Sequence, residues 1–129
     1  MYTTRPYNPE TDKAFVYSTW LRGLFYANDF YNQIERSAFF GNYPKVLDSI
    51  ISKSAINIAC DSEDNDVILA YVVLQNETLH YCYTKAAWRL KGLQKALLSV
   101  NPPKYCTHIT PIGNDMRLAR NIVFNPFLI

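Results

Sequence analysis

The chain has 129 residues, a hydrophobic fraction of 49% and a formal net charge of +2. The composition excludes an intrinsically disordered chain, and the length predicts a single domain over residues 1–129 with its own core. No apolar run approaches the roughly 18 residues of a membrane span, and the N-terminus has no apolar leader segment, so a cytoplasmic protein without a membrane partner is expected.

The N-terminal quarter is predicted as a strand followed by a helix. Residues 2–7 are β-prone, and the apolar spacing over 13–26 predicts a helix with one buried face. Thr11 or Asp12 is expected to cap this helix, because short polar side chains accept hydrogen bonds from the free N–H groups of a first turn. An irregular, aromatic segment follows.

A second helix and two strands are predicted next. Pro44, which follows the break at 41–43, is expected to be the first residue of a helix over 44–53. Apolar segments at 55–60 and 67–74 predict strands joined by a loop of acidic, turn-forming residues. That loop lacks the glycine and the terminal glutamate of a calcium-binding loop, so no metal site is expected there.

The chain is organised around residues 78–100, which are predicted as a strand, a turn and a helix. Alternation along the strand places Leu79, Tyr81 and Tyr83 on one face. Steps of three and four residues give the helix one buried stripe. The stripe consists of Leu90, Leu93, Leu97 and Val100.

Basic residues and a glycine open this predicted helix. Arg89, Lys91 and Gly92 lie where backbone N–H groups are unpaired and the helix dipole is positive, which favours an anion and above all a diphosphate. The segment 89–94, Arg-Leu-Lys-Gly-Leu-Gln, resembles the acyl-CoA pyrophosphate loop of the GNAT N-acetyltransferases. The family pattern is Gln or Arg, two residues, Gly, one residue, then Gly or Ala. Gln94 departs from it.

The C-terminal third is predicted as a strand, a helix and a final extended segment. The strand covers 105–110, and the helix covers 116–122 with Asn114 or Asp115 as its cap. The whole order is then β-α-α-β-β-β-α-β-α-β, a mixed α+β fold with an antiparallel meander and a parallel crossover through the central helix. A GNAT domain has this order, so the resemblance covers most of the chain.

The resemblance implies that acetyl-CoA, the acyl donor, lies between splayed fourth and fifth strands. Strand backbone would pair with the pantetheine amides, and the loop N–H groups would hold the diphosphate. The cofactor-binding residues implied in this way are Tyr83, Thr84, Arg89, Leu90, Lys91, Gly92, Leu93, Gln94 and Asn114. The bulky Gln94 either crowds the diphosphate or turns outward and donates to a phosphate, and the second arrangement is expected.

Catalysis requires a base, because an amine must lose a proton before it attacks a thioester. Glu77 and His80 are the candidates, and His108 lies on the next predicted strand. Buried histidines are more often structural than catalytic, and Ala119 stands where many family members carry a tyrosine that protonates the departing thiolate. Cofactor binding is therefore better supported than chemistry.

The cysteines are expected to be inert. Cys60, Cys82 and Cys106 are odd in number, widely spaced and set in apolar runs, which is typical of buried free thiols. No nucleophile motif and no metal-ligand spacing accompanies them.

Three functions stay open. An N-acetyltransferase acting on an amine-bearing small molecule or protein ranks first, with a homodimer as an assembly to consider. A catalytically inactive relative that serves as a structural or interaction protein, for example in a compact viral genome, ranks second. A nucleic-acid binder ranks third, through the basic span 85–104 with Tyr81, Tyr83 and Trp88 as stacking groups.

Overall fold

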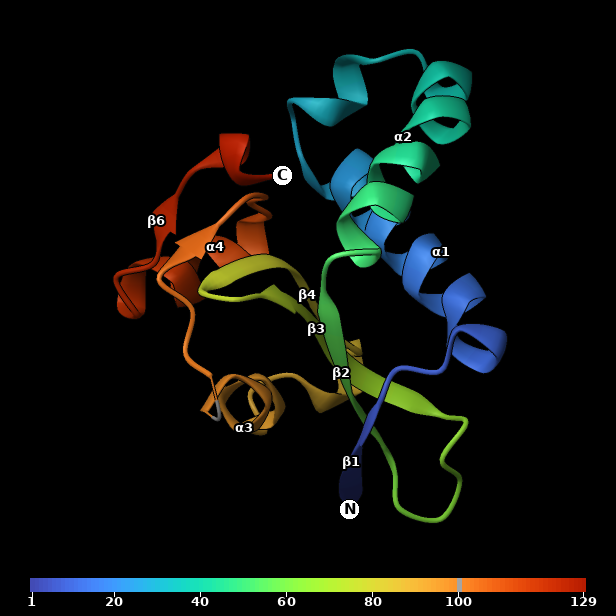
Figure 1. Ribbon diagram of the computed structural model, residues 1–129, viewed down its shortest axis with the longest axis vertical. Coiled ribbons are helices and arrows are strands. Elements are labelled where there is room, and N and C mark those ends of the chain that lie inside the picture. Colours follow the sequence, from blue (N-terminus) through green and yellow to red (C-terminus); the bar gives the residue numbers. More distant parts are fainter. Residues whose placement is uncertain (100) are drawn as a thin grey trace.

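The computed structural model describes residues 1–99 and 101–129, which form a six-stranded sheet with helices on both faces (Figure 1). The strands, in sheet order, are β1 (Tyr2–Pro6), β2 (Ala55–Asp61), β3 (Ile68–Gln75), β4 (Thr78–Thr84), β5 (Tyr105–Cys106) and β6 (Val123–Phe124). The helices are α1 (Pro9–Ala27), α2 (Arg36–Ile51), α3 (Leu93–Ser99) and α4 (Pro111–Ala119), with 3₁₀ helices at Tyr31–Gln33, Ala86–Trp88 and Pro126–Leu128. The predicted element order is confirmed.

The sheet is antiparallel from β1 to β4 and parallel from β4 through β5 to β6. Each parallel step uses a helix, α3 and then α4, as its crossover, because parallel neighbours cannot be joined by a tight turn. The predicted antiparallel meander and the predicted crossover through the central helix are therefore both present.

Two apolar clusters cover the two faces of the sheet. The first lies under α1 and α2, and the second lies under α3, with Met116 of α4 packed against it. Figure 1 shows α1 and α2 on one side of the sheet and α3 on the other. The largest fully buried side chains include Trp20 and Leu24 from α1, Leu47 from α2 and Leu98 from α3. β4 runs between these layers, so its two faces look toward two different sets of helices.

The first helix begins earlier than predicted. Asn8 is its N-cap, since the side chain accepts a hydrogen bond from Glu10 N, and Pro9 occupies the first turn. Asp12, expected as a cap, is instead 1% exposed and accepts two hydrogen bonds from Arg5 of β1. The predicted cap is wrong because proline needs no hydrogen-bond partner for its nitrogen and fits a first turn.

The second helix also begins earlier, at Arg36, and continues through Pro44. A proline inside a helix removes one backbone hydrogen bond and normally kinks or ends it. Here Phe39 before the proline and Leu47 and Ile50 after it are all buried against the first cluster. Their shared packing holds the two halves together, so the predicted helix start at Pro44 is wrong.

The central strand contains a β-bulge that the alternation argument missed. Val73 pairs with Tyr81 and Leu74 pairs with Leu79, so His80 is an extra residue in β4. The side chains change faces at this point: Leu79 belongs to the cluster under α3, whereas Tyr81 and Tyr83 pack with the cluster under α1. The prediction that all three share a face is therefore wrong for Leu79.

The loop after β4 is longer than predicted, and α3 starts at Leu93. Leu90, expected in the buried stripe, is fully exposed at 105% and has φ +63°. Leu93 and Leu97 are buried as predicted. Val100, the last member of the predicted stripe, lies outside the described residues.

The strand that was predicted over 105–110 is much shorter in the structure, and the helix after it starts earlier than predicted. β5 ends at Cys106, and Thr110 caps α4 by accepting a hydrogen bond from Gly113 N at 3.1 Å. The predicted cap at Asn114 is wrong, because Pro111 again occupies a first turn rather than closing a strand.

Candidate functional site

β4 and β5 part soon after they meet. Their register pairs Thr78 with Tyr105 and Leu79 with Cys106, and Thr107 N donates to Leu79 O at 3.2 Å. After Thr107 the chain leaves the sheet and turns into α4, whereas β4 continues to Thr84. A splayed pair of strands was the predicted setting of the cofactor, and this part of the prediction agrees with the geometry.

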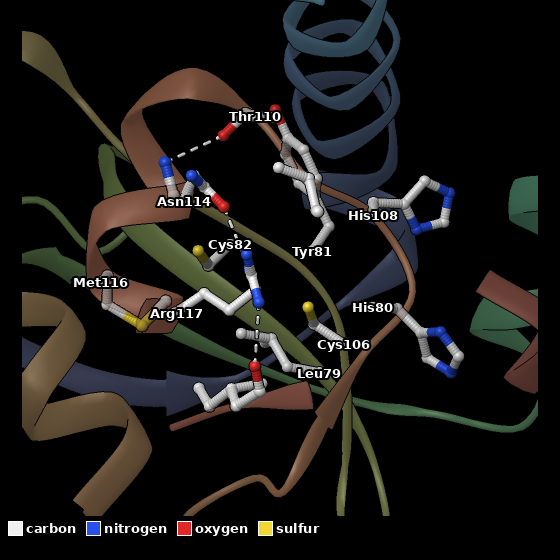
Figure 2. A pocket seen from close by; sticks show the side chains of 13 residues that line it. Leu79, His80, Tyr81, Cys82, Cys106, His108, Thr110, Asn114, Met116 and Arg117 are labelled. Carbon is white, nitrogen blue, oxygen red and sulfur yellow. Dashed lines mark hydrogen bonds between the residues drawn. The ribbon is translucent and has the colours of Figure 1, made fainter. Parts of the chain in front are cut away.

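A pocket fills the gap between the splayed strands and α4 (Figure 2). Its lining includes Tyr81 and Cys82 from β4, Cys106 from β5, and Thr110, Asn114 and Arg117 from the start of α4. The predicted cofactor residue Asn114 thus lies at the pocket, whereas Ala119, at the exposed end of α4, is not among its lining residues.

Arg117 places a positive charge at this pocket. Its Nε donates to Asn114 Oδ1 at 3.0 Å, and one terminal nitrogen donates to Ile122 O at 3.3 Å (Figure 2). A guanidinium has five N–H groups, so three are left to meet a ligand. Sequence reasoning missed Arg117, because nothing in the sequence shows which face of a short helix looks inward.

The cysteines at the pocket stay protonated. Burial raises the pKa of the Cys82 thiol to about 12, and burial likewise raises that of Cys106. A thiol rather than a thiolate is a poor nucleophile. Cys60, Cys82 and Cys106 are all free, so the prediction of free thiols is confirmed.

The far end of β4 is tied to α3 by Gln94. Its Nε2 donates to Tyr83 O and to Thr84 Oγ1, both at 2.8 Å, and its Oε1 is buried without a hydrogen-bond partner among the described residues. The amide therefore turns toward the strand. The outward orientation that was expected from the sequence is wrong. Arg89 reaches the same strand end, with Nε donating to Thr84 O at 3.2 Å.

The loop between β4 and α3 is exposed and has an unusual backbone. Arg89, Leu90, Lys91 and Gly92 all face solvent, and φ is +63° at Leu90 and +82° at Gly92. The Lys91 ammonium lies 5.6 Å from the centre of the Trp88 ring. Two cationic side chains, those of Arg89 and Lys91, thus precede the start of α3. The first residue of this helix, Leu93, has a buried side chain.

Glu77 lies at the other end of β4, away from the pocket of Figure 2. It sits in the turn between β3 and β4, where its carboxylate is 3.2 Å from Lys104 Nζ and is mostly exposed. With Gln75 and Thr78 it lines a separate surface depression. The structure therefore does not bring Glu77 and Cys82 into one pocket.

His80, the other predicted base, is buried and hydrogen-bonded at both ring nitrogens. Nδ1 is 2.9 Å from Thr107 Oγ1, and Nε2 is 3.0 Å from Gln75 Oε1. Burial, and to a smaller extent the charge of Lys53, lowers the His80 pKa to about 4. The ring is therefore neutral near pH 7.

His108 lies next to it and was named from the sequence without a role. Its Nδ1 is 2.9 Å from the same Thr107 oxygen, and its Nε2 is 2.7 Å from the Tyr43 hydroxyl on α2. Burial lowers its pKa to about 4 as well. In Figure 2 both imidazole rings point away from Arg117 and Cys82.

The aromatic side chains of β4 do not form an exposed stacking surface. Tyr81 is stacked on Trp20 with ring centres 5.1 Å apart, and Tyr83 is stacked on Tyr71 at 5.5 Å. Both belong to the cluster under α1. Single-stranded nucleic acid needs free ring faces, so this arrangement does not favour the nucleic-acid hypothesis.

In the part of the chain that the structure describes, no helix combines the length and hydropathy needed to cross a membrane. Among residues 1–99 and 101–129, no three His, Cys, Asp or Glu side chains gather into a group that could hold a metal ion.

No protein-family model matches the chain, and no curated protein matches its sequence. Solved structures do match. The apo form of YjaB from Escherichia coli has a TM-score of 0.55 and 16% identity, over 79% of this chain and 67% of that one. A GNAT-family acetyltransferase from Staphylococcus aureus has a TM-score of 0.51 and 13% identity, over 78% and 62%.

A third match covers nearly the whole of both chains. AAC(6')-Iy, solved with the bisubstrate analogue CoA-S-monomethyl-acetylneamine, has a TM-score of 0.52 and 12% identity, over 95% of this chain and 90% of that one. Identities this low carry information about fold and not about activity. The mixed six-stranded sheet, its helix order and the splayed β4 and β5 lead to one conclusion: the chain has the fold of the GNAT acetyltransferases.

Proposed function

We propose that the protein is an acetyl-CoA-dependent N-acetyltransferase that acts on an amine. The observation that carries the proposal is the pocket between splayed β4 and β5, followed directly by an exposed cationic loop at the start of α3. An extended pantetheine arm fits a gap between parting strands, and a diphosphate fits a loop with free N–H groups and two cations. The structural match to a protein bound to a CoA analogue supports the same cofactor.

The cofactor would contact three parts of the chain. The N–H groups of residues 90–94, with Arg89 and Lys91, would hold the diphosphate. The backbone of Tyr83 and Thr84 would meet the pantetheine arm, which must share or displace the hydrogen bonds that Gln94 and Arg89 make there. Asn114 would face the thioester end of the pocket from α4.

When bound, acetyl-CoA supplies the activated acyl group, and the chain must position an amine and remove its proton. His80 and Glu77 are the residues that we propose for receiving this proton. Arg117, whose guanidinium has free N–H groups at the pocket, would stabilise negative charge on the leaving sulfur. The amine itself can belong to a small molecule or to a protein.

The first experiment measures cofactor binding. Acetyl-CoA added at up to about millimolar concentration should raise the melting temperature by mass action. Arg89→Ala and Lys91→Ala should each weaken binding, whereas Lys45→Ala, an exposed lysine on α2, is the matched control and should not. An unchanged melting temperature for the wild-type protein would overturn the cofactor proposal and favour the interaction-module hypothesis.

The second experiment measures turnover. Release of the CoA thiol should be faster in the presence of an amine from a panel of polyamines, amino acids, aminoglycosides and peptide N-termini than in its absence. Binding of acetyl-CoA without turnover of any amine would favour the inactive relative.

A further inference from the structure

An apolar surface surrounds the open edge of the sheet at β6. Among the described residues, six of the twelve large apolar side chains that are exposed fall within residues 105–128. We call this group the β6-edge surface, and its members are Tyr105, Leu118, Val123, Phe124, Phe127 and Leu128. Single exposed apolar residues are normal on a protein surface, whereas a group of them marks a place where another molecule binds.

Strand register and shared contacts place these side chains next to one another. Val123 pairs with Tyr105 in the ladder between β5 and β6, and Tyr105 and Leu128 line the same surface depression. Leu118 is the penultimate residue of α4, the helix that precedes β6. In Figure 1, β6 and the segment after it lie at the margin of the molecule. The β6-edge surface is therefore one region and not a set of scattered positions.

The exposed side chains of β6 lie on both faces of the sheet. Neighbouring residues of a strand point to opposite faces, so Val123 and Phe124 do as well. Phe124 pairs with Cys106, which belongs to the apolar cluster under α3, so Phe124 lies on that face and Val123 on the opposite one. Val123 is 55% exposed and Phe124 is 42% exposed. A partner packed on one face would cover one of them, whereas a partner that continues the sheet covers both.

The outer edge of β6 has backbone groups that are able to pair. β6 is the last strand of the sheet, and its inner edge is bonded to β5. Val123 N donates to Lys104 O at 2.9 Å. Asn125 N donates to Cys106 O at 2.8 Å. Strand residues direct their backbone groups alternately to the two sides, so the N–H and C=O of Phe124 point outward, where a further strand can bind them.

The size of the β6-edge surface suits a stable dimer. Its side chains range from 37% exposed at Tyr105 to 90% exposed at Phe127, which corresponds to roughly 600–700 Å² of accessible surface, against about 800 Å² per partner in a standard interface. The exposed polar residues Arg120 and Asn121 adjoin it and extend the area with a polar rim. Two copies of this one surface therefore reach the area that stable association needs.

We propose that a second copy of this chain binds to the β6-edge surface, with the two β6 strands antiparallel to each other. A two-fold axis lets the same surface serve on both chains, so each open edge is covered by the other. The two copies of Phe124 then lie opposite each other and exchange two backbone hydrogen bonds. The two six-stranded sheets become one continuous sheet. This interface goes beyond the proposed acetyl transfer and does not depend on it.

Sedimentation velocity over about 1–200 µM protein measures the assembly, and the melting temperature should rise over the same range, because only folded chains associate. The mass should approach a plateau at twice the 14.9 kDa of one chain. A mass that stays at one chain throughout would overturn the proposal. Growth beyond the dimer without a plateau would overturn it as well, since that indicates a contact that does not close on itself.

Added charge tests the location of the interface. Phe127→Asp alters a side chain that is 90% exposed, so the fold should tolerate it, and it should raise the dimer Kd at least about tenfold because a carboxylate is then buried. Val123→Lys places a lysine on the edge strand, a change that blocks strand pairing, and should act in the same direction.

Leu90→Asp is the matched control, because Leu90 is fully exposed and lies outside the β6-edge surface. It should leave the dimer Kd unchanged. Circular dichroism should show the wild-type fold in Phe127→Asp and in the control. Undiminished dimerisation of Phe127→Asp and Val123→Lys would overturn the assignment of the interface, and so would an equal loss in Leu90→Asp.

Amide hydrogen exchange, followed by NMR, tests the strand pairing itself. The Phe124 N–H should exchange at least about tenfold more slowly at concentrations where the chain is dimeric than where it is monomeric, because a partner strand then accepts its hydrogen. Phe127→Asp should abolish this dependence on concentration. A dimer in which the Phe124 N–H stays unprotected would show that the two copies meet elsewhere, and it would overturn the continuous sheet.

Discussion

At its Thr78 end β4 lies between β3 and β5, and the His80 ring that projects from it is buried and hydrogen-bonded at both nitrogens. At its Thr84 end the strand has left β5 and runs into the exposed loop of residues 89–92. One strand thus joins an enclosed region, where polar groups are shielded from water, to an open region, where basic side chains face solvent. The two regions should respond differently to pH and to substitution.

The largest expected effect is a loss of stability at acidic pH, caused by the buried histidines at the enclosed end of β4. Because His80 and His108 have pKa values of about 4 against an ordinary 6.5, the unfolded chain binds protons between pH 6.5 and 4 that the folded chain does not. The free energy of unfolding should therefore fall as the pH drops through this window, by on the order of 3 kcal/mol per histidine. Below pH 4 the two histidines should cause no further loss.

Urea unfolding at pH 7, 6, 5 and 4.5 measures this dependence. His108→Gln should remove about half of it, whereas Arg89→Ala at the open end should leave it unaltered. A stability that is flat from pH 7 to 5 would show that the two rings are not buried as neutral groups.

A smaller effect tests the packing beside the pocket. A Cβ added to Gly23 of α1 would clash with Tyr81 Oη, so Gly23→Ala must displace a buried ring. We expect a net destabilisation of about 1–2 kcal/mol, because the cost of overpacking is larger than the gain in helix propensity from replacing glycine by alanine. Gly41→Ala in α2 is the control, since nothing lies within 4 Å of the new methyl, and it should stabilise by up to about 1 kcal/mol. Equal changes in urea unfolding would argue against the close contact.

The open end can be probed through its backbone. Gly92 has φ +82°, so Gly92→Ala should cost about 1–2 kcal/mol and weaken acetyl-CoA binding by distorting the loop. Leu90 has φ +63° and an exposed side chain, so Leu90→Gly should relieve backbone strain of the same kind. The glycine also makes the unfolded chain more flexible, which opposes this gain. The net change in the free energy of unfolding should therefore stay within about 1 kcal/mol. Urea unfolding and acetyl-CoA titration measure both. If Gly92→Ala left stability unchanged and Leu90→Gly lowered it, the backbone conformation described for this loop would be contradicted.

The smallest effect is expected at Gln94, which links the open loop to the strand. Gln94→Ala loses two hydrogen bonds and also removes the buried, unpaired Oε1, so stability should change by less than about 1 kcal/mol. Acetyl-CoA affinity should stay within about threefold, because the amide faces β4. A drop of more than tenfold would revive the hypothesis that Gln94 donates to a phosphate.

The sequence by itself determined the order of the elements and where the loop and the central strand lie. Runs of apolar residues with periods near two and near 3.6 are local signals, so β4 and α3 could be predicted, and so could the cationic loop at Arg89–Gln94. The resemblance to the GNAT family followed from the same local information. The N-caps Asn8 and Thr110 were missed because a proline after a polar residue fits both a turn and a first helical turn.

Only the tertiary structure decided which side chains of these elements meet. The bulge at His80 reverses the faces of β4, and a one-residue shift in a period of two cannot be read from the strand's own sequence. Gln94 turned inward because a strand end lay within its reach. Tyr43 and Gln75 lie 32 positions apart in the chain. Side-chain hydrogen bonds link them through His108, Thr107 and His80, because α2, β3, β4 and the segment after β5 fold against one another. Hydrogen bonds between distant segments depend on that packing, and no local pattern specifies them.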